Sequence, residues 1–205
     1  MYHIPYKMYS VFGFRFSQIE IRDLTKGWGI ISLAFGIVLT GIGNLTSTMF
    51  LLNIALSAFT VGTAFILHEL GHKFVAQRYG YLAEFRSFDQ MLFFALLMSF
   101  FGFVFAAPGA VMIAGNPGRQ KNGIISATGP LVNIILSIMF FAGYFLVHQN
   151  IVFRYGLLIN AWIALFNMIP FGAFDGKKIL DWHKGAYGTM VGASALLVFF
   201  SFTLL

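Results

Sequence analysis

Cysteine is absent from this chain of 205 residues, and charged residues are scarce. Without cysteine, disulfide bonds and thiolate catalysis are both excluded. Only 10% of the residues are charged, whereas a typical soluble domain is about a quarter charged. Hydrophobic residues make up 59% of the chain, and the mean hydropathy is +0.81. These values indicate a polytopic membrane protein.

The net charge of +6 does not require a nucleic-acid partner. In a membrane protein, Lys and Arg mark the cytoplasmic loops. We therefore expect no nucleic acid among the partners and expect the lipid bilayer to be one.

Apolar runs fill most of the sequence and predict a mainly α-helical membrane bundle. A spanning helix needs about 20 apolar residues, and five runs have roughly that length: 28–48, 50–75, 123–147, 151–171 and 186–205. We expect about five spanning helices in a single domain, 1–205. Residues 1–26 partly alternate polar and apolar side chains, which predicts a short β segment or an interfacial segment.

A sixth apolar run, 91–114, differs from the others because Pro108-Gly109 interrupts its second half. Hydropathy alone favours an ordinary spanning helix with a proline kink. The alternative is a segment that enters the membrane as a helix or strand and returns to the same side.

His68, Glu69 and His72 form the pattern H-E-x-x-H within an apolar run. On a helix, residues four apart share a face, so both imidazoles can bind one metal ion. Glu69 lies about a quarter of a turn away, placed to act on a water molecule beside the metal. A structural polar cluster is the alternative, but unpaired ionisable groups are costly in a membrane, which favours a functional site.

A catalytic zinc site usually has three protein ligands and one open position. Most of the other acidic residues and histidines occur in polar flanking segments. Asp175 differs because it follows the run 151–171, after Pro170 and Gly172 interrupt that helix. Such a break can turn a carboxylate back towards the membrane interior, so Asp175 is the candidate third ligand.

Two further motifs extend this pattern along the chain. One is N-x-x-P-x-x-x-x-D-G, with Asn167, Pro170 and Asp175-Gly176; the other is G-P-x-x-N, with Gly129-Pro130 and Asn133. Together with H-E-x-x-H, they resemble the site-2 protease family of intramembrane zinc metalloproteases, in a minimal form without a PDZ domain.

The resemblance implies one zinc ion held by His68, His72 and Asp175, with a catalytic core over 50–176. It implies that Glu69 is the catalytic acid and base, and that Asn167 contacts the substrate or the oxyanion. For Asn133, both a packing role and a substrate-clamping role stay open. The substrates would be transmembrane segments of other proteins.

A helical substrate must unwind before its scissile carbonyl can be attacked, and a strand edge can hold the extended form. In related proteases a re-entrant strand or hairpin has this role. We assign it to residues 103–114, with Ala107, Gly109 and Val111 as substrate-binding residues.

The distribution of Lys and Arg favours the returning form of 91–114. If this segment returns, the 13 basic residues divide 12 against 1 between the two sides of the membrane; if it crosses, they divide 8 against 5. The positive-inside rule then places the N-terminus and the mouth of the active site in the cytoplasm. We expect an integral protein of a prokaryotic cell membrane.

Other functions are compatible with parts of the pattern. A second class of membrane zinc protease uses H-E-x-x-H with a glutamate as third ligand, but Glu20 and Glu84 are poorly placed for it. A membrane metal carrier or a catalytically silent substrate-binding protein is the alternative from outside the enzymes. A silent protein would not need Glu69.

Overall fold

The computed structural model describes residues 7–104, 108–147 and 150–203. The chain is mainly helical, as predicted, and forms two compact units. Unit 1 consists of Met1–Ala58 and Ala76–Gly115, and unit 2 of Phe59–Val75 and Asn116–Leu205. Because two compact units can belong to one membrane domain, the single domain stays a prediction.

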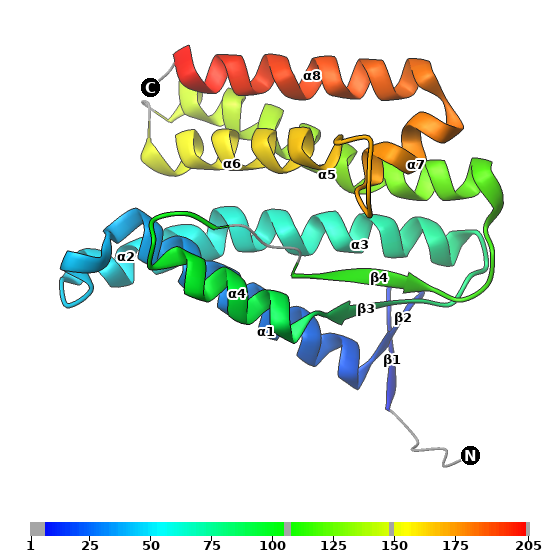
Figure 1. The fold of residues 1–205 in the computed structure, drawn as a ribbon, viewed down its shortest axis with the longest axis horizontal. Helices are drawn as coiled ribbons and strands as arrows, with labels where there is room; N and C mark the ends of the chain where they lie inside the picture. The colour runs from blue at the N-terminus through cyan, green and yellow to red at the C-terminus, as the bar shows by residue number, and fades with distance from the viewer. Residues whose placement is uncertain (1–6, 105–107, 148–149, 204–205) are drawn as a thin grey trace. The chain divides into compact units, whose positions relative to one another are not determined.

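Unit 1 combines helices with two small antiparallel sheets (Figure 1). Its elements are β1 (Met8–Val11), β2 (Phe14–Ser17), α1 (Gln18–Thr40), a short 3-10 helix (Ile42–Asn44), α2 (Thr48–Ser57), β3 (Ala83–Ser87), α4 (Asp89–Ser99) and β4 (Gly109–Ile113). β1 pairs with β2, and β3 pairs with β4. The predicted N-terminal β segment is therefore present.

α1 begins ten residues before the run predicted from hydropathy, at Gln18 instead of residue 28. Ser17 caps its first turn by accepting a hydrogen bond from the Glu20 amide, as a favourable N-cap residue does. The helix ends at Gly41, whose φ of +75° suits glycine. Gly36 lets α2 approach closely, because a Cβ there would lie 2.7 Å from the Ile54 side chain.

The run 91–114 returns to its starting point and does not form a continuous helix. Its first part is α4, and its second part is strand β4. The amide of Phe88, just before α4, donates to the carbonyl of Pro108, just before β4, over 2.9 Å. From there β4 runs antiparallel to β3, with Ser87 opposite Gly109. The returning form is therefore confirmed, and the kinked spanning helix is excluded.

The outer edge of β3 is occupied by carboxylates from α1. The Phe85 amide donates to Oε1 of Glu20 over 2.9 Å, and the Ser87 amide donates to Oδ2 of Asp23 over 3.3 Å. Both carboxylates are buried. These bonds satisfy strand amides that would otherwise lack a partner in an apolar setting.

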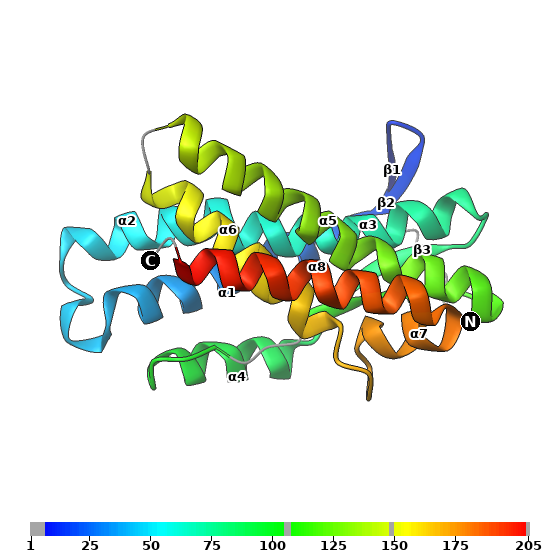
Figure 2. The same ribbon diagram turned by 90° about the horizontal axis from the view of Figure 1, so that it is seen from above.

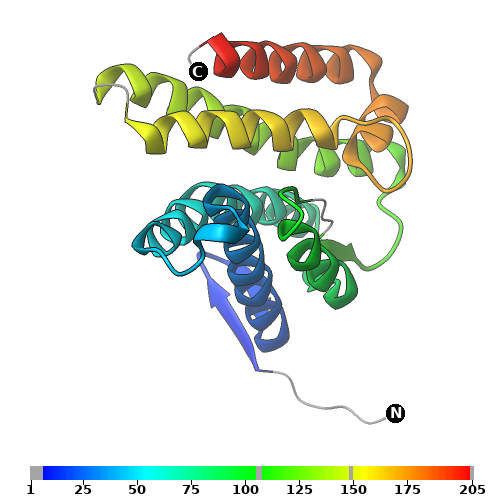
Figure 3. The ribbon, with the colours of Figure 1, turned by 60° about the vertical axis from the view of Figure 1, so that its left-hand side comes forward.

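Unit 2 is a bundle of helices (Figure 3). It contains a short π-helix (Ala58–Gly62) apart from its first residue, and most of α3 (Thr63–Arg78). The other helices are α5 (Gly118–Leu146), α6 (Ile151–Asn167), α7 (Asp175–Trp182) and α8 (Lys184–Thr203). α6 packs against both α5 and α8, and α7 packs against α5. Buried apolar side chains of α5 to α8 form the core, including Ile134, Leu157, Ile179 and Leu197.

Within the described residues, four helical stretches are long and apolar enough to cross a membrane. They are Gln18–Thr40, Thr48–Arg78, Gly118–Leu146 and Lys184–Thr203. The fifth predicted span, 151–171, is shorter than expected because α6 ends at Asn167. Its 17 residues extend over about 25 Å, which is the lower limit for a spanning helix. The architecture is that of a helical membrane bundle.

Candidate metal centre

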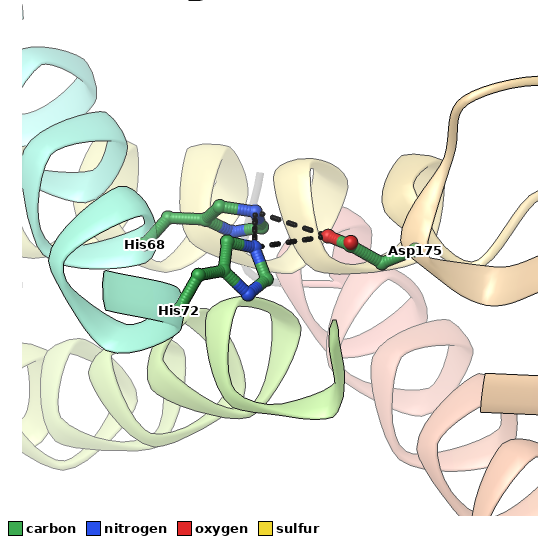
Figure 4. Close-up of side chains that lie close together, drawn as sticks. All are labelled: His68, His72 and Asp175. Carbon is green, nitrogen blue, oxygen red and sulfur yellow. Dashed lines mark hydrogen bonds and ion pairs between the residues drawn. The ribbon is translucent and has the colours of Figure 1, made fainter. Parts of the chain in front are cut away.

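Three buried side chains from two helices meet in unit 2 (Figure 4). His68 and His72 lie one turn apart on α3, and Asp175 is the first residue of α7. The two Nε2 atoms are 3.1 Å apart. Oδ2 of Asp175 lies 3.4 Å from Nε2 of His68 and 3.1 Å from Nε2 of His72.

These spacings fit a single metal ion. In tetrahedral zinc coordination with bonds of about 2.0–2.1 Å, neighbouring ligand atoms are about 3.3–3.4 Å apart. The three atoms observed here form a triangle close to that size. Two imidazoles and a carboxylate are a typical ligand set for a catalytic zinc site, which keeps its fourth position open.

The hydrogen bond made by His72 Nδ1 determines which of its ring nitrogens can bind metal. Nδ1 lies 2.8 Å from the carbonyl oxygen of Ile125. Because a carbonyl only accepts, Nδ1 must carry the proton. Nε2 of the neutral ring therefore presents a lone pair towards His68 and Asp175.

A chain of amides fixes His68 in the same way, starting from a backbone carbonyl of α6. Nδ2 of Asn160 donates to the Gly156 carbonyl over 2.8 Å, so Oδ1 of Asn160 faces Asn133. Asn133 donates to that oxygen over 3.0 Å and to the Ala64 carbonyl over 3.3 Å. Oδ1 of Asn133 is then left to accept from Nδ1 of His68 over 2.5 Å.

When both rings are neutral, the Nε2 atoms that they direct at the carboxylate are therefore unprotonated. Three electron-pair donors at this distance repel one another unless a cation lies among them. The Nζ of Lys178 lies 3.5 Å from Oδ1, the other carboxylate oxygen.

Glycines provide the space that this arrangement needs. A Cβ on Gly129 of α5 would overlap Nε2 of His72 and would lie 2.6 Å from Nε2 of His68. Gly71, between the two histidines, brings α3 against α5, where its Cβ would lie 3.2 Å from Thr128 and Val132. A Cβ on Gly176 would overlap the backbone of Met168, so glycine after Asp175 lets α7 start against the end of α6.

The other predicted catalytic residues, Glu69 and Asn167, lie on α3 and α6. Glu69 follows His68 on α3 and is buried, with 9% of its surface exposed. Asn167 is the last residue of α6, and its side-chain amide donates to the Ile163 carbonyl of its own helix over 2.9 Å. In the described part of the chain, no hydrogen bond joins Asn167 to the three candidate ligands.

Two of the three predicted substrate-binding residues belong to β4 in unit 1. Gly109 is opposite Ser87, and Val111 is opposite Phe85. A Cβ on Gly109 would overlap the Phe85 ring and the Arg86 carbonyl, so glycine is needed for this pairing. Ala107 lies outside the described residues.

Sequence reasoning missed three contributors to the centre: Gly129 as the source of space, the Ile125 carbonyl, and Asn160. It considered Asn133 for packing or substrate clamping and did not anticipate the bond to His68. A usable signal existed for Asn160, because a polar amide within the apolar run "LLINAWIAL" is expected to have a specific partner. The identity of that partner depends on the packing of α5 against α6.

Comparison with known proteins gives one informative similarity. The chain is 36% identical over 176 residues to the protein of Methanocaldococcus jannaschii named "Putative zinc metalloprotease MJ0611". The alignment covers 83% of this chain and 87% of that protein. No protein-family model matches the chain, and no solved structure matches it.

We expect Gly129→Ala to weaken metal binding at this centre by more than tenfold, because its methyl group would occupy the space beside both Nε2 atoms. Metal titration of the purified chain in detergent, followed by mass spectrometry of bound metal, measures the effect. Gly188→Ala in α8 is the matched control, since nothing lies within 4 Å of a Cβ at that position. Equal metal affinity in the two variants would contradict the assigned role of Gly129.

Proposed function

Because this chain belongs to the family of the archaeal protein named as a zinc metalloprotease, we propose that it is a membrane-embedded zinc metalloendopeptidase. We place it in the site-2 protease type, which hydrolyses peptide bonds within or near transmembrane segments of other membrane proteins. The observation that carries this proposal is the convergence of two imidazole Nε2 atoms and one carboxylate oxygen, at tetrahedral spacing, beside Gly129.

In this proposal His68, His72 and Asp175 hold one zinc ion. When bound, the ion activates water and polarises the peptide carbonyl. His68 donates from Nδ1 to Oδ1 of Asn133, and His72 donates from Nδ1 to the Ile125 carbonyl; these bonds keep the two neutral imidazoles in the metal-binding tautomer. Lys178 partly neutralises the carboxylate oxygen of Asp175 that faces away from the histidines.

Glu69 acts as the general base and then as the general acid. It takes a proton from the attacking water and returns it to the leaving nitrogen of the cleaved peptide. Its position one residue after His68 places it on the adjacent face of α3, beside the ligands and not among them. Asn167 contacts the substrate or the oxyanion after its side chain leaves the Ile163 carbonyl.

Two substitutions test the assigned roles separately. We expect Glu69→Gln to retain zinc and to lower the cleavage rate by at least about 100-fold, since general acid–base catalysis contributes about 10²–10⁴. Asp175→Ala removes one of three ligands and should deplete the zinc. The measurements are metal content and cleavage of a panel of single-span membrane proteins in detergent.

Undiminished cleavage by Glu69→Gln would refute the protease mechanism and favour a metal carrier. Full zinc retention by Asp175→Ala would refute the ligand set. Whether the chain is a protease would then be decided by the cleavage rate of Glu69→Gln.

We further propose that the substrate binds as an extended strand along the free edge of β4. Within the described residues the sheet has two strands, and Glu20 and Asp23 occupy the outer edge of β3. Because the Phe85 amide points to Glu20, the pair Phe85–Val111 is of the type that exchanges no hydrogen bonds. The N–H and C=O of Val111 therefore point away from β3, where a substrate strand could pair with them.

Val111→Pro removes one of these outward N–H groups without removing a bond to β3. We expect kcat/KM for a transmembrane substrate to fall by about tenfold, as the loss of a well-formed hydrogen bond predicts, while zinc content is unchanged. Val111→Ala keeps the N–H and is the control. Equal kcat/KM for the two variants would exclude strand addition at this edge without bearing on the metal site.

For membrane orientation, we propose that the N-terminus and the mouth of the active site face the cytoplasm. The return of the chain between Phe88 and Pro108 supports the topology in which the basic residues divide 12 against 1. A cysteine introduced at Lys121 should react with a membrane-impermeant thiol reagent only when the cytoplasmic side is accessible. Exclusive labelling from outside would invert the proposed orientation.

A further inference from the structure

The hairpin formed by β1 and β2 has two unlike faces. Residues directly opposite each other in an antiparallel pair share a face. One face is entirely apolar or aromatic and consists of Tyr9, Val11, Phe14 and Phe16. The other is mixed and more polar, and consists of Met8, Ser10, Arg15 and Ser17.

The more polar face borders a cavity in unit 1, although Met8, Ser10 and Arg15 are exposed; on the apolar face, Phe14 and Phe16 are half-buried. Met8 and Arg15 line a cavity of about 730 Å³ together with Gln77, Glu84 and Arg86. Gln77 holds the hairpin by the edge of β2, because its side chain accepts from the Arg15 amide over 3.0 Å and donates to the Arg15 carbonyl over 2.9 Å. On the apolar face, Tyr9 is 44% exposed and Val11 is 49% exposed.

The residue at the tip of the hairpin has a strained backbone conformation and a large apolar side chain that is exposed. Phe12 is 97% exposed and has a φ of +50°. It occupies the first position of a two-residue turn with Gly13, whose φ is +82°. Asn or Gly usually fills the first position of such a turn, since a bulky side chain is strained there. A large aromatic side chain at this point therefore suggests an apolar environment outside the chain.

The surroundings of the hairpin indicate what that environment is. β2 ends at Ser17 and α1 begins at Gln18, with no linker between them. The two strands run across the direction of α1 (Figures 1 and 2). If α1 crosses the bilayer, the hairpin extends along the membrane surface at the end of α1. Lys7, Arg15 and Arg22 are exposed in the same region.

We propose that the β1–β2 hairpin is an interfacial anchor that binds an anionic lipid surface. Tyr9, Val11 and Phe12 enter the boundary between headgroups and acyl chains, as the apolar sides of interfacial segments do. The exposed basic side chains face the negative lipid headgroups. This inference concerns membrane attachment alone and does not depend on proteolysis.

The absence of native cysteine allows a direct test in the full chain. Single variants Val11→Cys, Phe12→Cys and Ser10→Cys are nitroxide-labelled and reconstituted in vesicles of phosphatidylcholine and phosphatidylglycerol. Paramagnetic resonance then compares the accessibility of each label to oxygen, which dissolves in lipid, with its accessibility to a water-soluble nickel chelate. Ser10, which belongs to the more polar face, is the matched control.

We expect the oxygen-to-nickel ratio to be severalfold higher at positions 11 and 12 than at position 10. Equal ratios at the three positions would overturn the proposal, because the apolar face would then be in water. Shielding of positions 11 and 12 from both reagents would also overturn it, since it would indicate a protein partner or a second copy of the chain.

A second variant isolates the role of Phe12. Asn tolerates a positive φ better than Phe, so Phe12→Asn should keep or increase thermal stability in detergent. In vesicles the same substitution should lower the oxygen-to-nickel ratio of the Val11→Cys label severalfold, whereas Phe12→Trp should preserve it. An unchanged ratio in Phe12→Asn would refute the anchoring role of the tip.

Discussion

The metal centre depends on a hydrogen-bond chain that starts at a backbone carbonyl of α6. Gly156 orients Asn160, Asn160 orients Asn133, and Asn133 accepts from Nδ1 of His68, so that Nε2 is the unprotonated nitrogen of the neutral ring. Each step follows from the donor or acceptor character of the group before it, because buried polar groups in apolar surroundings need partners. The helix packing of unit 2 therefore sets which nitrogen of the neutral His68 ring carries the proton, in a group of side chains that could hold a metal ion.

Buried polar groups also need hydrogen-bond partners in unit 1, where the groups concerned lie at the edges of strands. Glu20 and Asp23 accept from amides of β3, and Gln77 bonds to the backbone of β2. Open strand edges are costly in an apolar setting and attract other strands. With the outer edge of β3 occupied, β4 presents main-chain groups of alternate residues, including Val111, at its free edge. The proposed substrate strand and the proposed lipid-facing hairpin thus involve different parts of the same unit.

Sequence patterns anticipated the returning segment but misjudged where the first helix starts. The difference at α1 has a physical cause, since Glu20 and Asp23 resemble a polar flank when only the sequence is considered. In the structure both carboxylates are buried in α1 and bonded to β3. Likewise, the run 151–171 ends as a helix at Asn167, before Pro170 and the positive φ of Gly172.

The sequence by itself determined the chemistry available to this protein. Spacing places His68 and His72 on one helical face, and the break after α6 singles out Asp175. Only the tertiary structure decided that these atoms meet at the spacing of a metal site and that Gly129 lets α5 pass close to both imidazoles. It alone identified Asn160 as a partner of Asn133. The physical reason is that ligand types and helical faces follow from local periodicity, whereas tautomers and close approaches depend on which helices pack together.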